Sequence, residues 1–137
     1  MKQRLRLLIV ESPNADLASL LYALDSQGFE ITPAVVSTPK DMRITLDAQE
    51  WDLIICCQPV PDFPAVAALV LAKEVLPLVP FIIVSSETDL NLAVALVKLG
   101  AQDYVQKNEL MRLGPVSDRR SPMPSPSESA KLRTNTS

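Results

Sequence analysis

The chain has no histidine and only three glycines among its 137 residues. Without histidine it can provide no imidazole metal ligand, no histidine general base and no phosphohistidine. Three glycines are too few for the glycine-rich loops that hold phosphates in P-loop and dinucleotide-binding proteins, and no such loop follows a predicted strand. These absences exclude several common classes of enzyme and of nucleotide-binding protein.

Cysteine and long apolar runs are also scarce. The two cysteines, Cys56 and Cys57, are adjacent, so they cannot close a loop in an ordinary disulfide framework. No apolar run reaches the roughly 18 residues of a membrane span. The run after the basic N-terminal residues, Leu7 to Val10, is too short for a signal peptide. We therefore expect a cytoplasmic protein with no membrane association.

The composition is that of one globular domain followed by a tail. With 47% hydrophobic and 21% charged residues, the chain can bury a core. We place a domain at residues 1–116 and a disordered, Ser/Pro-rich tail at 117–137. Residues 1–117 hold nine basic against fourteen acidic side chains, a net of −5, whereas residues 118–137 have a net of +2. The acidic domain is not expected to bind nucleic acid directly.

Short apolar segments alternate with segments of helical periodicity along the first 113 residues. The predicted strands are Leu5–Val10, Ile31–Val36, Leu53–Cys57, Phe81–Val84 and Asp103–Val105. The predicted helices run from the Ser12-Pro13 cap to Gly28, from the Thr38-Pro39 cap to Gln49, from Pro64 to Leu76, from Thr88 or Asp89 to Gly100, and from an Asn108 cap to Gly114-Pro115.

Five such units predict an α/β fold with a parallel, doubly wound sheet, because parallel strands need helical crossovers on both faces. In sheets of this kind, ligands and chemistry lie at the carboxyl ends of the strands. That rule selects four places in the chain, which are Glu11-Ser12, Cys56-Cys57, Ser85-Ser86 and Lys107.

The strand ends resemble those of the receiver domains of bacterial response regulators. Receivers have an acidic pair after strand one, an aspartate before a Met-Pro-type loop after strand three, Ser or Thr after strand four, and an aromatic residue three positions before a lysine. The matching residues here are Glu11, Val60-Pro61, Ser85, and Tyr104 with Lys107. The resemblance covers residues 4–113 and is nearest to receivers attached to sensory histidine kinases, since Asn108 follows the lysine.

The resemblance implies a flavodoxin-like strand order, 2-1-3-4-5, with helices on both faces. It also implies a role in two-component phosphorelay signalling, with a sensor histidine kinase or a downstream effector as partner. Tyr104 corresponds to the aromatic residue that switches between buried and exposed positions in the family, although simple packing at the edge of the fourth helix is an equal alternative.

Two departures from the family pattern decide what the site can do. Cys57 stands at the phospho-acceptor position, and Ser12 stands where the second acidic residue belongs. A thiol is a soft, poor magnesium ligand and cannot form an acyl phosphate. We therefore expect a pseudo-receiver: not an enzyme, without a cofactor, and with magnesium binding at the remaining Glu11 weak or absent.

The other site residues have structural interpretations as well. We expect Glu11 to form an ion pair with Lys107, and Ser85 to hydrogen-bond to neighbouring backbone. Cys56 should fill the core, because successive side chains of a strand point to opposite faces. Cys57 should face the pocket, where a nearby Lys107 would lower the pKa of its thiol.

Three functions follow from these alternatives. The preferred one is a non-catalytic module that binds a partner through the face of the fourth helix, fifth strand and fifth helix, which includes Lys98, Asp103, Gln106, Glu109 and Arg112. The second is an active phosphorelay receiver that uses another acceptor, for which Asp62 is the candidate. The third is a thiol redox switch at Cys57. A homodimer is compatible with each of them.

Overall fold

Five strands form one parallel sheet in the order β2-β1-β3-β4-β5 within the described part of the chain. The computed structural model describes residues 3–86 and 89–113. The strands are β1 (Gln3–Val10), β2 (Phe29–Val36), β3 (Leu53–Gln58), β4 (Phe81–Ser85) and β5 (Asp103–Gln106). The predicted strand order is therefore confirmed, and each predicted strand is present, with one of its ends extended by one or two residues.

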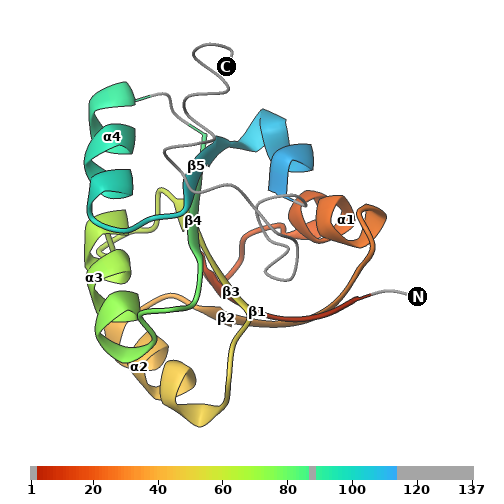
Figure 1. Ribbon diagram of the computed structural model, residues 1–137, viewed down its shortest axis with the longest axis horizontal. Helices are drawn as coiled ribbons and strands as arrows, with labels where there is room; N and C mark the ends of the chain where they lie inside the picture. The colour runs from red at the N-terminus through yellow and green to blue at the C-terminus, as the bar shows by residue number, and fades with distance from the viewer. Residues whose placement is uncertain (1–2, 87–88, 114–137) are drawn as a thin grey trace.

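Helices cover both faces of the sheet, as Figure 1 shows. On one face lie α2 (Pro39–Ala48), α3 (Ala65–Val75) and α4 (Leu90–Lys98); on the other lie α1 (Ala18–Ser26) and the 3-10 helix η1 (Lys107–Arg112). None of the helices in the described residues is long and apolar enough to cross a membrane.

The strands are buried on both sides, and their side chains alternate between two apolar cores. The core beneath α2, α3 and α4 contains Leu8, Val10, Ile54, Cys56 and Ile83. The core beneath α1 contains Leu7, Ile9, Ile55, Cys57 and Val84. The two adjacent cysteines thus face opposite sides of the sheet, as the strand period predicts.

Local signals in the sequence define most of the helix ends. Thr38 caps α2 by accepting a hydrogen bond from the Asp41 N–H at 3.1 Å, and Asp89 caps α4 by accepting one from the Leu92 N–H at 3.0 Å. Gly28, which follows α1, has a φ of 98°, a conformation that glycine adopts without steric cost.

Two predicted helix starts are wrong. Ser12-Pro13 does not begin α1; the Ser12 carbonyl instead accepts the Ala15 N–H at 3.2 Å, and the Asp16 carboxylate accepts the Ala18 N–H at 2.9 Å. These local bonds satisfy the backbone in a turn, so the helix begins only at Ala18. Likewise, Asn108 caps no α-helix, because η1 begins directly after Gln106 with no side-chain cap. The predictions for Thr88, Gly114-Pro115 and the tail lie outside the described residues.

Candidate functional site

The sheet register brings the predicted site residues to one edge. Val10 pairs with Cys56, Gln58 pairs with Ser85, and Ser85 pairs with Gln106. The residues that follow or end these strands, including Glu11, Cys57 and Lys107, therefore converge at the carboxyl end of the sheet. The site foreseen from the strand ends is thus formed by the three central strands and β5.

Cys57 occupies the centre of this site and is almost fully buried, with 3% of its surface exposed. The carboxylate of Glu11, itself only 6% exposed, lies near enough for its negative charge to raise the pKa of this thiol. A thiol and a carboxylate thus lie close together at the positions where the receiver domains that the sequence resembles have the phospho-accepting aspartate and an acidic residue.

Glu11 is held by bonds to its own neighbourhood. Its Oε1 accepts the Ser12 N–H at 2.8 Å, and its backbone N–H donates to the Val36 carbonyl at 3.0 Å. The hydroxyl of Ser37 donates to the Glu11 carbonyl at 2.7 Å. These bonds at the end of β1 fix the carboxylate against β3.

The expected ion pair between Glu11 and Lys107 is not formed. The ion pairs of the described residues include Arg6 with Asp52 and Arg43 with Glu74, but none joins Glu11 to Lys107. Lys107 is exposed at the first position of η1, whereas the Glu11 carboxylate is buried and turned toward the Ser12 N–H and the Cys57 thiol. The exposed ammonium keeps its contact with water, which costs no desolvation.

The pKa of the Cys57 thiol is raised, which is the opposite of the sequence-based prediction. Burial is the main cause, and the negative charge of Glu11 adds to it; Lys107 lowers the pKa by a smaller amount. Burial likewise raises the pKa of Cys56 to about 12. Both thiols are therefore protonated at neutral pH, and the basis of the redox-switch hypothesis is removed.

Slow alkylation in the native state is the measurable consequence. Both thiols should react with iodoacetamide at pH 8 on the order of 100-fold more slowly than in the urea-unfolded chain, since reaction needs an exposed thiolate. Time-resolved mass spectrometry gives the two rates. Equal rates in the folded and unfolded chain would show that Cys57 is open to solvent.

Gln58 is a site residue that sequence reasoning missed. Its side-chain amide donates to the Cys56 Sγ and to the Cys57 carbonyl, both at 3.2 Å, and to the Phe63 carbonyl at 3.5 Å. The amide thus joins the end of β3 to the loop before α3. A polar residue between a buried strand and Pro59 was the available signal.

Ser85 and Tyr104 lie beside a small pocket of about 100 Å³ beneath α4. Ser85 is 4% exposed and Tyr104 is half-buried. The other lining residues come from β3, α3, β4 and α4, and include Gln58, Ala65, Ile83, Asp89 and Leu92. The structure thus places the two residues together, and a switching motion of Tyr104 stays a prediction.

The donor atoms at this edge do not fit magnesium. Glu11 supplies one carboxylate that already accepts the Ser12 N–H, Ser12 supplies a hydroxyl, and Cys57 supplies a protonated thiol. Among the described residues, no group of three or more acidic, cysteine or histidine side chains could hold a metal. Asp62, the other candidate acceptor, is exposed in the loop after β3 with a φ of 62°.

No protein-family model matches the chain, and no curated protein matches it. Solved structures do match. A LuxR-family response regulator from Aurantimonas sp. is 14% identical, with a TM-score of 0.71 and 99% of each chain covered. A response regulator receiver domain from Clostridium thermocellum is 21% identical, with a TM-score of 0.68, 96% of this chain and 98% of that chain covered.

A third match is the receiver domain of a sensor histidine kinase from Pseudomonas aeruginosa, whose structure has a magnesium ion coordinated in the active-site cleft. It is 19% identical, with a TM-score of 0.66, and the match covers 84% of this chain and 95% of that chain. Together with the strand order and the position of Cys57, these similarities show that the chain has the fold of response regulator receiver domains.

Proposed function

We propose that this protein is a pseudo-receiver: a cytoplasmic signalling module of a two-component system that acts by binding partners and does not accept a phosphoryl group. The observation that carries the proposal is the buried Cys57 thiol at the end of β3, beside the buried carboxylate of Glu11. The receiver fold supports the two-component context.

The chemistry of the site explains why phosphoryl transfer is lost. Transfer to a receiver needs a carboxylate nucleophile, and positive charge must neutralise the moving phosphoryl oxygens. Here the nucleophile position holds a thiol, a second carboxylate is replaced by Ser12, and the remaining Glu11 is buried and accepts the Ser12 N–H. Lys107 can still supply positive charge, but no carboxylate at the acceptor position can receive the phosphoryl group.

The partner surface that we propose is the face of α4, β5 and η1. Of the polar residues predicted for it, Lys98 and Glu109 are exposed, and Asp103 and Gln106 are partly exposed; the Arg112 side chain lies outside the described residues. Apolar side chains of α4 are exposed as well, so the surface combines apolar area with charge. A sensor histidine kinase or a downstream effector is the class of partner that this surface would serve.

Intact-mass analysis after incubation with acetyl phosphate and Mg²⁺ tests the proposal on the whole chain. We expect no acid-stable or hydroxylamine-sensitive phosphoryl adduct, because no described carboxylate combines the acceptor position with a metal site. An adduct that Asp62→Ala removes would instead establish an active receiver with a displaced acceptor.

A further inference from the structure

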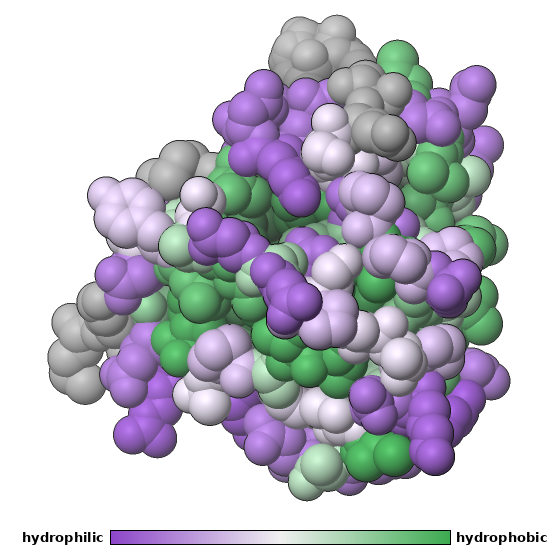
Figure 2. Space-filling model, turned by 180° about the vertical axis from the view of Figure 1, so that it is seen from behind, coloured by the Kyte–Doolittle hydropathy of each residue, from purple (hydrophilic) through white to green (hydrophobic). Residues whose placement is uncertain are grey.

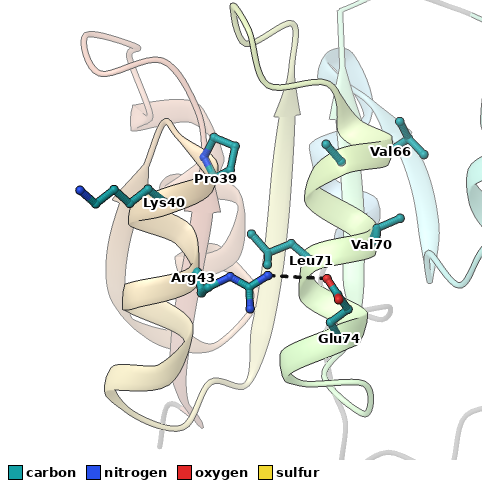
Figure 3. A pocket seen from close by; sticks show the side chains of 8 residues that line it. Pro39, Lys40, Arg43, Val66, Val70, Leu71 and Glu74 are labelled. Atoms are coloured by element: carbon teal, nitrogen blue, oxygen red, sulfur yellow. Dashed lines mark ion pairs between the residues drawn. The ribbon is translucent and has the colours of Figure 1, made fainter.

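A groove runs between α2 and α3 on the outer surface of the helical layer (Figure 3). It has a volume of about 480 Å³, and its lining on α3 is mostly apolar. Leu71 points toward α2, whereas Val66 and Val70, 42% and 50% exposed, lie on the side of α3 that faces away from α2. Arg43 on α2 and Glu74 on α3 meet across it at 3.7 Å. Lys40 and Pro39 line it at the start of α2.

An apolar stripe lies on α4, in the same helical layer. Leu90, Val94 and Val97 are spaced i, i+4, i+7 and are 74%, 53% and 40% exposed, whereas Leu96 is the buried residue of this helix. From behind, apolar side chains reach the surface along the right-hand edge of the molecule, where α4 lies (Figure 2). A helix with its apolar side in water is a docking element.

We propose that two copies of this chain form a symmetric dimer in which the α4 stripe of each copy lies along the α2–α3 groove of the other. The occupant of the groove is thus a second copy. The inference goes beyond the proposed function by naming a second copy as the occupant of the apolar side of α4, which belongs to the proposed partner surface; the dimer itself needs no phosphoryl chemistry.

The topology makes this arrangement self-complementary. Because each of these helices follows a strand of one parallel sheet, α2, α3 and α4 run in the same direction. A two-fold axis parallel to α3 therefore places α4 of one copy over α2 and α3 of the other, with the helix starts at the same level. Both grooves and both stripes are used, so the assembly closes as a dimer.

The charges at the two ends of the stripe complement those of the groove. At the starts of the helices, Asp89 of one copy would face the exposed Lys40 of the second copy. At the ends, Lys98 would face Glu74 of the second copy, whose carboxylate also pairs with Arg43 at 3.7 Å. The three stripe residues between them are uncharged, so they bring no repulsion into the apolar lining.

Sedimentation velocity of the full chain across micromolar to millimolar concentrations tests the dimer. We expect Val70→Asp in the groove and Val94→Asp on the stripe each to weaken the dimer at least about 30-fold, because each buries a carboxylate against apolar surface. Tyr22→Asp is the control, since Tyr22 is 70% exposed on α1, across the sheet. A wild-type chain that stays monomeric, or a dimer that Tyr22→Asp disrupts, would overturn the inference.

A charge exchange tests the register. Lys98→Glu should weaken the dimer about fivefold by placing two glutamates together, and Glu74→Lys should do the same with two lysines. The double variant should return to the wild-type affinity. If Val94→Asp disrupts the dimer while Val70→Asp and the Glu74 exchange leave it unchanged, the two α4 helices pack on each other and the groove is not the contact.

Discussion

Cys57→Asp alone should accept little phosphate from acetyl phosphate, whereas Cys57→Asp combined with Ser12→Asp should be phosphorylated at position 57 in a magnesium-dependent reaction. The initial rate of the single variant should be on the order of 100-fold below that of the double variant. The two variants differ by one carboxylate, so the comparison isolates the contribution of the second acidic position.

The reason lies in the contacts of Glu11. Its Oε1 accepts the Ser12 N–H at 2.8 Å, so one carboxylate would have to hold this backbone group and the metal. Magnesium requires a nearly octahedral set of hard oxygen atoms. The single variant offers the new aspartate and the Glu11 carboxylate, which already accepts a backbone hydrogen bond, whereas the double variant adds a third carboxylate at position 12. Ser12→Asp adds the missing oxygen ligand at a half-buried position. Lys107 then has a charged phosphoryl group to neutralise.

Phosphate-affinity gels with a magnesium titration measure the two rates. Lys107→Ala in the double variant is the matched control, and it should lower the rate without loss of folding, since Lys107 is exposed. Circular dichroism must show that the variants are folded, because position 57 is 3% exposed and an aspartate there is costly. Full magnesium-dependent activity of the single variant would mean that Ser12 is no obstacle.

The fold was predictable because its signals are local and repeated. Leu5–Val10 and Leu53–Cys57 are continuous apolar runs, and such runs separated by helical segments are typical of parallel sheets. The Thr38 cap and the Asp89 cap also follow from side chains within three residues of the groups that they bind. Because the carboxyl ends of parallel strands share one edge, the meeting of Glu11 with Cys57 followed from topology alone.

What the sequence did not reveal depends on competition between possible partners and on burial. Lys107 was expected to pair with Glu11, but the neighbouring Ser12 N–H binds that buried carboxylate instead. The pKa of Cys57 depends on burial by surrounding elements, which no local pattern encodes. The start of α1 was misplaced because the turn bonds near Ser12 compete with a helix cap.

The stability of the protein should fall steeply above pH 9 because of its two buried thiols. Both have a raised pKa in the folded chain, Cys56 to about 12, against an ordinary value of 9.0. Their contribution is fully present below pH 9 and is lost as the pH rises, because only the unfolded chain then releases these protons. Each thiol should cost about 1.4 kcal/mol per pH unit, so the pair should cost about 5 kcal/mol by pH 11.

A loss of that size is comparable to the whole stability of a small domain, which is about 5–15 kcal/mol, so alkaline unfolding should be complete or nearly so. Urea titrations followed by Trp51 fluorescence at pH 7 and at pH 10, where the chain is still folded, give the two free energies of unfolding. The control is the Cys56→Ala, Cys57→Ala double variant, which starts less stable but should lose less stability between the two pH values. The lowered pKa of Lys73 acts with the opposite sign in both proteins and cancels in the comparison. If the free energy of unfolding declines equally in the wild type and the double variant, the thiols ionise in the folded state. Cys57 would then be reactive, contrary to what its burial beside Glu11 predicts.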